Sequence, residues 1–243
     1  MLNRLAQKTT SMIIDSVKKH PKISFLVCLV GCGLITVTYA SQIAKPIAVQ
    51  DIPVNSYTSL ERIPEVTEHL DVSKWPSGYP VPISGLAYLK LKYWGYDNKE
   101  HIGELIVNKS LAKEVVEIFT ELYKIKFPIE QMRLIHEFKN DDDASMEANN
   151  TSAFNCRAIT GKPGIFSQHS YGNAIDINPF TNPYVKQSKQ LILPKGAEKF
   201  ADRNTDAQGK ITKDSQVYKL FTDRGWDWGG NWHDLQDYQH FEK

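Results

Sequence analysis

The sequence predicts a compact α+β domain whose loops build a functional site. Three observations support this class. Apolar and polar residues alternate from Leu86 and again from Gly103, which is typical of strands, and the segment 110–126 has the spacing of an amphipathic helix. Beyond these elements the chain is rich in turns, asparagine, glycine and aromatic residues rather than in periodic runs. Binding and catalytic groups are concentrated on loops that a small scaffold positions.

The first element is an uncharged apolar segment from Ile23 to Ala40, which follows a basic tail, residues 1–22. Its 18 residues are a minimal length for a membrane span and slightly long for the core of a signal peptide. Positive charge before such a segment keeps the N-terminus cytoplasmic and sends the following chain across the membrane. We expect a hydrophobic helix over 23–40 and an exported protein in the periplasm or cell envelope.

Three fates of this segment remain open. The small residues of "TYA" before Ser41 suit cleavage of a signal peptide, and the uncleaved segment would anchor the protein in the membrane. The stretch "LVGC", Leu29 to Cys32, resembles a bacterial lipobox, although the apolar run continues beyond Cys32. All three predict export of the body.

Residues 41–83 contain six prolines and no sustained periodicity, which predicts a linker that becomes the entry to the domain. The domain itself is predicted over 84–243. It begins with the two strands "LAYLKLKYW" and "GELIVN", and the helix that follows packs its apolar side on their sheet. Pro128 ends this helix, and "MRLIHEF" is a candidate further strand.

Charge and cysteine content exclude several functions. After residue 40 the chain has 24 basic and 27 acidic residues without a basic run, which argues against a nucleic-acid partner. Cys156 is the only thiol in this part. Neither a cysteine-rich zinc site nor a thiol redox pair can therefore form there.

The stretch "SQHSYGNAID" suggests a metal site. His169 and Asp176 lie seven positions apart, and Gly172 and Ala174 between them allow a close approach of the backbone. A catalytic zinc site has three protein ligands and one open position for water, so an imidazole and a carboxylate would fill two of its four positions. His240, in "DYQHFEK", is the expected third ligand, with His233, His101 and His136 as rivals.

Hydrolysis at such a site also requires a base and a group that stabilises negative charge. Asp237 stands three positions before His240, so a bend is needed to bring both into one cavity; Glu242 is the alternative base. Arg157 is the candidate for stabilising the oxyanion, and Ser167 is a candidate for holding substrate. Each residue alone also has a structural interpretation: a hydrogen-bonded core histidine, a cap or a surface ion pair.

The stretches "FNCRAITG", "FSQHSYGNAIDINPFTNPY" and "GWDWGGNW…DYQHFE" together resemble the D-alanyl-D-alanine carboxypeptidase-like zinc metallopeptidases, which include L-alanyl-D-glutamate endopeptidases. The family signature is SxHxxGxAxD followed by (D/E)xxH, and Ser167, His169, Asp176, Asp237 and His240 match it. The resemblance covers about residues 84–243 and is strongest after Asn150. The tryptophans of "WDWGGNW" are expected to pack a loop against the sheet.

This resemblance implies one Zn²⁺ ion bound by His169, Asp176 and His240, with Asp237 as base and Arg157 near the substrate carbonyl. It also implies a small antiparallel sheet with flanking helices, the hedgehog/D-Ala-D-Ala-peptidase-like fold, and peptidoglycan stem peptides as substrate.

The long loop between Pro183 and Gln216 is where specificity could differ, so both a carboxypeptidase and an endopeptidase remain possible. Two other functions also remain open. One is a non-catalytic, zinc-containing module that binds the cell wall or a partner, and the other is a zinc hydrolase acting on a different exported peptide.

Overall fold

A computed structural model describes residues 23–30, 33–40, 45–69, 80–160 and 162–243. The chain divides into two compact units, Met1–Lys45 and Pro46–Lys243. In the first unit, β1 (Ile23–Val30) and β2 (Gly33–Ala40) form an antiparallel pair, so the hydrophobic helix expected over 23–40 is not confirmed. Among the residues described, no helix combines the length and the apolar character needed to cross a membrane. The basic tail, residues 1–22, lies outside the described residues.

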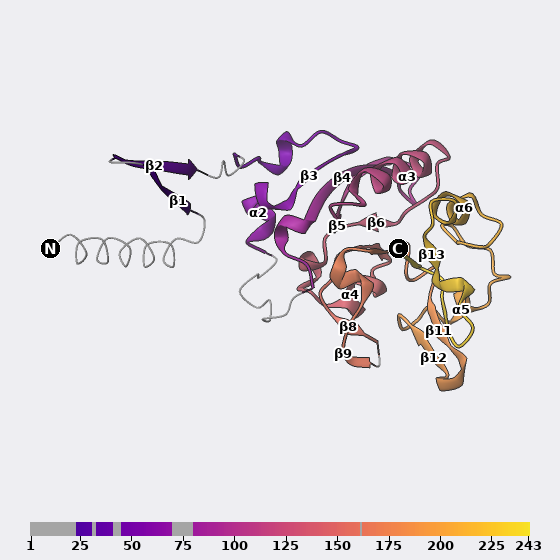
Figure 1. The fold of residues 1–243 in the computed structure, drawn as a ribbon. Coiled ribbons are helices and arrows are strands. Elements are labelled where there is room, and N and C mark those ends of the chain that lie inside the picture. Colours follow the sequence, from indigo (N-terminus) through magenta and orange to yellow (C-terminus); the bar gives the residue numbers. More distant parts are fainter. Residues whose placement is uncertain (1–22, 31–32, 41–44, 70–79, 161) are drawn as a thin grey trace. The chain divides into compact units, whose positions relative to one another are not determined.

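The scaffold of the second unit is a three-stranded antiparallel sheet (Figure 1). Its strands are β3 (Ser56–Ser59), β4 (Leu86–Trp94) and β5 (Glu100–Asn108), in that order. Alternation puts Leu89, Leu91 and Val107 on one face, where they pack against α3 (Ala112–Lys124). The two predicted strands and the predicted helix are therefore present. The helix ends at Lys124, a few residues before Pro128.

The other face of this sheet is covered by residues from the connection between β3 and β4. Tyr88 and Ile106 pack there with Leu60, Ile63 and Val66 in a second buried cluster. These last residues belong to η2 (Leu60–Arg62), α2 (Pro64–Thr67) and the residue between them. The second unit begins at Pro46, so it includes most of the segment 41–83, for which a linker and domain entry were predicted.

Two further three-stranded sheets carry the C-terminal half. One has the order β10–β15–β13 and the other β12–β11–β14, and all their pairings are antiparallel. Their strands are β10 (Ala174–Asp176), β11 (Tyr184–Lys186), β12 (Leu191–Leu193), β13 (Asp227–Trp228), β14 (Gln236–Asp237) and β15 (His240–Glu242). The predicted long loop between Pro183 and Gln216 therefore contains part of a sheet.

Short elements complete the unit. They are η1 (Val49–Asp51), η4 (Ile83–Gly85), β6 (Gln131–Met132), η5 (Ile135–Phe138), α4 (Asp142–Glu147), β7 (Asn150–Thr151), β8 (Ala158–Ile159), β9 (Lys162–Phe166), η6 (Gln168–Tyr171), η7 (Gln187–Lys189), α5 (Glu198–Ala201), α6 (Gln216–Thr222) and η8 (Gly229–Asn231). The stretch "MRLIHEF" is not one strand, because only Met132 pairs and the chain then turns into η5.

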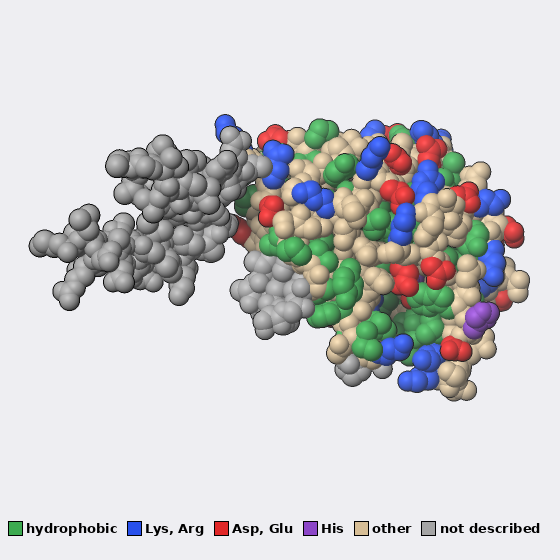
Figure 2. Space-filling model, in the orientation of Figure 1, with side chains coloured by type: hydrophobic (Ala, Val, Ile, Leu, Met, Phe, Trp, Pro, Cys, Tyr) green, Lys and Arg blue, Asp and Glu red, His purple; other side chains and the backbone are tan. Residues whose placement is uncertain are grey.

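The combination of helices with small antiparallel sheets confirms the α+β class. Basic and acidic side chains are interspersed over the face of this unit that Figure 2 shows, in keeping with the nearly balanced charge of the sequence.

Candidate active site

His169 is placed by a short turn that docks on the scaffold. It lies in η6, where the Ser167 hydroxyl accepts a hydrogen bond from the His169 backbone N–H at 3.4 Å. The turn ends at Gly172, which has φ +70° and whose carbonyl accepts from the Asn108 N–H at 2.8 Å. A Cβ on Gly172 would come within 2.5 Å of the Asn108 nitrogen, so only glycine allows this contact with the end of β5.

Asp176 and His240 face each other across two paired strands. They are direct partners in the register of β10 and β15. On its other side Asp176 exchanges two backbone hydrogen bonds with Ser152, at 2.8 and 3.0 Å. Both side chains are about 7% exposed. The strand that supplies His240 is thus locked in register with the strand that supplies Asp176.

The three side chains converge. The His169 Nε2 lies 3.0 Å from Asp176 Oδ2, the His240 Nδ1 lies 2.9 Å from Asp176 Oδ1, and the two imidazole nitrogens are 3.2 Å apart. Ligands about 2.0–2.1 Å from a tetrahedral zinc ion are separated by about 3.3 Å. The donor set and its spacing therefore fit a small divalent metal ion, with a fourth position left for another ligand.

Hydrogen bonds on the outer side orient both rings. The His169 Nδ1 lies 2.5 Å from the Ala153 carbonyl oxygen, and the His240 Nε2 lies 3.0 Å from Glu242 Oε2. Each inner nitrogen also faces an Asp176 oxygen, at 3.0 and 2.9 Å, so a metal ion at the centre requires the tautomers in which the outer nitrogen carries the proton and donates it to these acceptors. The inner nitrogens, His169 Nε2 and His240 Nδ1, then present lone pairs to the common centre, as metal ligation requires.

Electrostatics favour a cation at this point. Burial alone would raise the pKa of Asp176, but the charges and hydrogen bonds of His169 and His240 outweigh it and hold this pKa well below its ordinary value. Burial opposes the charged form of His240, yet the hydrogen bonds that it donates to the carboxylates of Asp176 and Glu242 raise its pKa to about 10. The cluster thus stabilises positive charge, which either a proton or a metal ion can supply.

Asp237 lies beside this cluster on a different sheet. It belongs to β14, and the turn at Tyr238 and Gln239 provides the bend that the sequence interpretation required. Burial raises the pKa of Asp237 to about 6, with His240 opposing the shift and Asp176 adding to it. Its Oδ1 is buried without a hydrogen-bond partner among the described residues. A carboxylate in this state can accept a proton near neutral pH.

Gly229 allows Asp237 to approach. A Cβ at residue 229 would lie 2.6 Å from the Asp237 carbonyl oxygen and 2.8 Å from its Cβ. Two of the three nearby tryptophans, Trp226 and Trp228, are buried in the core, as expected for "WDWGGNW". The third, Trp232, differs: its ring lies 5.4 Å from the ring of His240.

Arg157 is held close to the cluster by an ion pair. Its Nε lies 3.0 Å from Asp142 Oδ2, and its backbone N–H donates to the Ser170 hydroxyl at 3.0 Å. Arg157 also opposes the rise in the pKa of Asp237, so its charge acts at the site. The structure thus gives Ser167 a capping role and Arg157 a carboxylate partner; their contacts with substrate stay predictions.

The rival histidines lie elsewhere. His101 pairs with Asp97 at 2.9 Å on an exposed part of β5, and His233 is exposed. Within the described part of the chain, His169, Asp176 and His240 form the only group whose three ligating atoms lie within 4.8 Å of one another.

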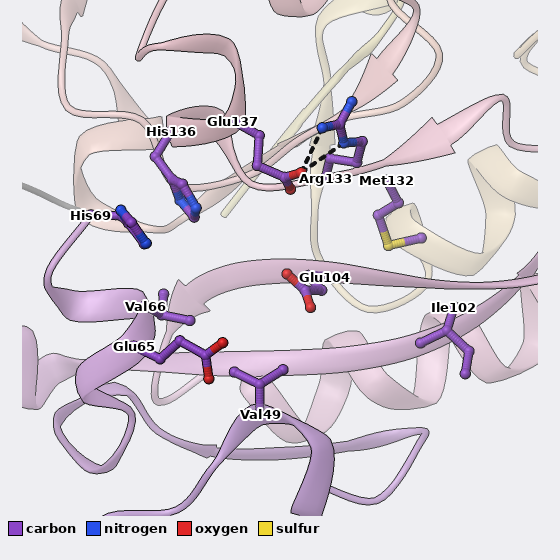
Figure 3. Close-up of a pocket in the computed structure, with 10 residues that line it drawn as sticks. All are labelled: Val49, Glu65, Val66, His69, Ile102, Glu104, Met132, Arg133, His136 and Glu137. Atoms are coloured by element: carbon purple, nitrogen blue, oxygen red, sulfur yellow. Dashed lines mark hydrogen bonds and ion pairs between the residues drawn. The ribbon is translucent and has the colours of Figure 1, made fainter.

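His136 lines a separate hollow of about 410 Å³ (Figure 3). Its ring stacks on His69 with centroids 5.1 Å apart, and burial together with His69 lowers the pKa of His136. The carboxylates of Glu65 and Glu104 lie at different places along the hollow, and Glu137 is paired with Arg133 at 2.6 Å (Figure 3). These groups do not converge on one point.

Sequence reasoning missed several residues around the cluster. The Ala153 carbonyl is a backbone group and leaves no signal in a sequence. Asp142 lies in "NDDDAS", which is typical of a solvated loop, but it begins α4 and binds Arg157 and Asn155. Glu242 was considered only as an alternative base. Its spacing of two residues from His240, within one strand, could have identified the hydrogen bond.

A comparison with known families identifies the C-terminal part. Residues 160–243 match the model of a family described as D-alanyl-D-alanine carboxypeptidase. The match contains His169, Asp176, Asp237 and His240, whereas Ala153 and Arg157 precede it. No curated protein and no solved structure matches the chain. The resemblance seen in the sequence is therefore confirmed for residues 160–243, which are similar to the D-alanyl-D-alanine carboxypeptidase family of peptidases.

Proposed function

We propose that this protein is an exported zinc metallopeptidase that hydrolyses an amide bond in peptidoglycan stem peptides. The observation that carries the proposal is the convergence of His169, Asp176 and His240, whose ligating atoms lie within 4.8 Å of one another, beside the buried carboxylate of Asp237. The family match supports a peptidase, and the composition of the ligand set favours zinc.

Three side chains, His169, Asp176 and His240, would hold the zinc ion. When bound, zinc supplies a Lewis acid that makes a water molecule more acidic and polarises a carbonyl group. Asp237 then acts as the general base: it accepts the proton of the attacking water and later gives it to the leaving amine. The raised pKa of Asp237 suits both transfers, because a base near neutrality also works as an acid in the return step.

Arg157 stabilises the negative charge that develops on the substrate carbonyl oxygen, or the free carboxylate of a C-terminal residue. Asp142 and Ser170 hold the Arg157 segment before substrate arrives. Because the guanidinium Nε faces Asp142 and the Nη1 makes a long hydrogen bond to the Ala158 carbonyl, at 3.5 Å, the Nη2 is the nitrogen most available to substrate. Trp232, next to His240, provides an apolar wall for the methyl group of an alanine residue.

The apolar segment 23–40 supports export, and an uncleaved or lipidated segment would hold the enzyme at the membrane near its substrate. A body with interspersed charges and a slight acidic excess supports a peptide rather than a nucleic-acid partner.

The test is digestion of purified peptidoglycan by the full chain, followed by mass spectrometry of the released fragments. We expect products that disappear when a chelator is added and return with Zn²⁺. Loss of a terminal alanine from the stem would identify a carboxypeptidase, and cleavage within the stem would identify an endopeptidase.

The control is Asp237→Asn, which keeps the three metal ligands. If folded wild-type protein loaded with zinc gives no product, the proposed activity is wrong. Equal binding of peptidoglycan by both proteins, again without product, would instead indicate a non-catalytic wall-binding module.

A further inference from the structure

The carboxylate of Glu242 lies behind the His240 ring, on the side away from the metal cluster. The His240 Nδ1 faces Asp176 at 2.9 Å, whereas its Nε2 faces Glu242 Oε2 at 3.0 Å. These two nitrogens are on opposite edges of the imidazole. The ring therefore stands between Glu242 and the point where the three ligands converge.

The strand geometry explains why Glu242 can reach this position. His240 and Glu242 are two residues apart in β15, so their side chains leave the same face of the strand. Phe241 between them points to the opposite face, where it is fully buried and stacks on Phe221 with ring centroids 4.1 Å apart. Packing of this ring in the core prevents β15 from rotating about its axis.

The backbone of Glu242 is also held on both sides. It is paired with Ala174 of β10 and with Asp227 of β13, because β15 is the central strand of its sheet. The side chain retains partial contact with solvent, at 31% exposure, while His240 is 7% exposed. The carboxylate is therefore presented from a rigid strand at the edge of the buried cluster.

A neutral imidazole has one N–H group, and its two tautomers place that group on different nitrogens. Only the tautomer with the proton on Nε2 leaves the Nδ1 lone pair free for a metal ion. The Asp176 carboxylate, 2.9 Å from Nδ1, favours the other tautomer when no cation is bound, whereas the Glu242 carboxylate, 3.0 Å from Nε2, favours the binding tautomer and increases electron density on the ring. The Ala153 carbonyl has the equivalent place behind His169, but it is uncharged.

We propose that Glu242 is a positioning residue that acts through His240: it holds the tautomer and orientation in which His240 binds a divalent cation, and it strengthens that binding. The inference deepens the proposed function, because it rests on cation binding by His169, Asp176 and His240, but it does not depend on which peptide is cleaved. It also replaces the alternative in which Glu242 is the general base.

The test measures the affinity of the full chain for Zn²⁺ alone, by competition with a chromophoric chelator. We expect Glu242→Ala to bind zinc about 10–100-fold more weakly than wild type. Glu242→Gln should fall between the two, because its amide oxygen still accepts the hydrogen bond but carries no charge. The matched control is Glu137→Gln, which removes a carboxylate next to His136 and should bind zinc as wild type does.

A second measurement separates positioning from general loss of structure. In zinc-loaded wild-type protein, nitrogen-15 NMR should show the His240 proton on Nε2, and Glu242→Ala should weaken or broaden this signal while leaving the His169 signal in place. If Glu242→Ala fails to fold, Glu242→Gln, which is nearly the same size, supplies the comparison.

The outcomes separate this inference from the proposed function. Weaker zinc binding in Glu242→Ala supports the inference even if wild type cleaves no peptidoglycan. Unchanged zinc affinity overturns it, and unchanged affinity together with lost peptidase activity would make Glu242 the base. Absence of zinc binding by wild type would overturn both proposals.

Discussion

Two regions of this molecule each contain two imidazoles and at least one carboxylate, yet only one resembles a metal centre. At His169 and His240, oxygen acceptors hold the outer nitrogens, and the inner nitrogens meet Asp176. At His69 and His136, the rings stack on each other, and the buried His136 Nδ1 has no hydrogen-bond partner among the residues that the structure describes. Composition is similar in the two regions. The difference is that hydrogen bonds from the outer nitrogens of His169 and His240 orient these two rings, so that their inner nitrogens both face Asp176.

The largest expected effect is on zinc affinity, which should depend on a histidine of the first region and not on one of the second. We expect His240→Ala to bind Zn²⁺ more than about 100-fold more weakly than wild type and to lose peptidase activity, because losing a ligand should exceed the 10–100-fold effect of losing a residue that supports one. His136→Ala should bind zinc normally. Chelator competition on both variants measures this, and equal losses would mean that the hollow in Figure 3 contributes to the metal site.

The next effect concerns the carboxylate beside each pair of imidazoles. Asp237→Ala should retain zinc but lose about 10²–10⁴-fold in kcat, the range for removal of a general base. Glu104→Gln, in the hollow with His136, should leave kcat unchanged. Steady-state rates on isolated stem peptides and a zinc assay on the same samples test this. A fully active Asp237→Ala protein would remove the assignment of the base.

Two crowded glycines provide a third, smaller contrast. Gly229→Ala places a methyl group against Asp237. Gly103→Ala places one 2.5 Å from the Cβ of Met132, a residue that lines the same hollow as His136. Each should cost about 1–3 kcal/mol of unfolding free energy because the contacts are too close. Only Gly229→Ala should also lower kcat, by about tenfold or more, since small displacements of a catalytic group are costly.

Denaturant unfolding and kinetics on both glycine variants give this comparison. A similar loss of kcat in Gly103→Ala would show that general destabilisation, rather than displacement of Asp237, reduces the activity.

The smallest effect is a pH dependence of stability. Burial raises the pKa of Asp237 to about 6 from the ordinary value of 3.8, so ionisation destabilises the fold as pH rises through this interval. Asp237→Asn should therefore stabilise the protein prepared without metal at pH 7, by no more than about 3 kcal/mol, the free-energy equivalent of the full shift. The advantage should shrink towards pH 4. Thermal unfolding of both proteins across this range measures the difference; a constant difference would contradict the raised pKa.

Periodicity explains which parts of the fold could be predicted from sequence. The strand Leu86–Trp94 and the helix Ala112–Lys124 are long enough to show their repeat, and both were predicted. Leu60, Ile63 and Val66 cover one face of the sheet from short helical turns, whose burial has no period, so only a linker and domain entry are predicted there. The prediction of a single strand over "MRLIHEF" was wrong for the same reason. Its buried side chains come from a two-residue strand and a short 3-10 helix, and neither is long enough to show a repeat.

The candidate site was predictable where side chains alone define it. The spacing of His169 and Asp176, together with the C-terminal histidine, led to the three residues that converge. The surroundings depend on contacts between segments distant in sequence. Asp142 reaches Arg157 only because α4 is packed there, and Gly229 matters only because β14 passes over it. Such contacts have no local pattern.

The two hydrogen bonds behind the imidazoles also differ in how mutation can affect them. The acceptor for His169 is the main-chain oxygen of Ala153, which every amino acid at that position would retain, subject only to the size limit of a 3% exposed site. The acceptor for His240 is a side chain, which a single codon change can remove. Mutation can therefore remove the hydrogen-bond acceptor of His240 far more easily than that of His169. Natural variants with weakened metal binding should cluster at position 242 rather than at position 153.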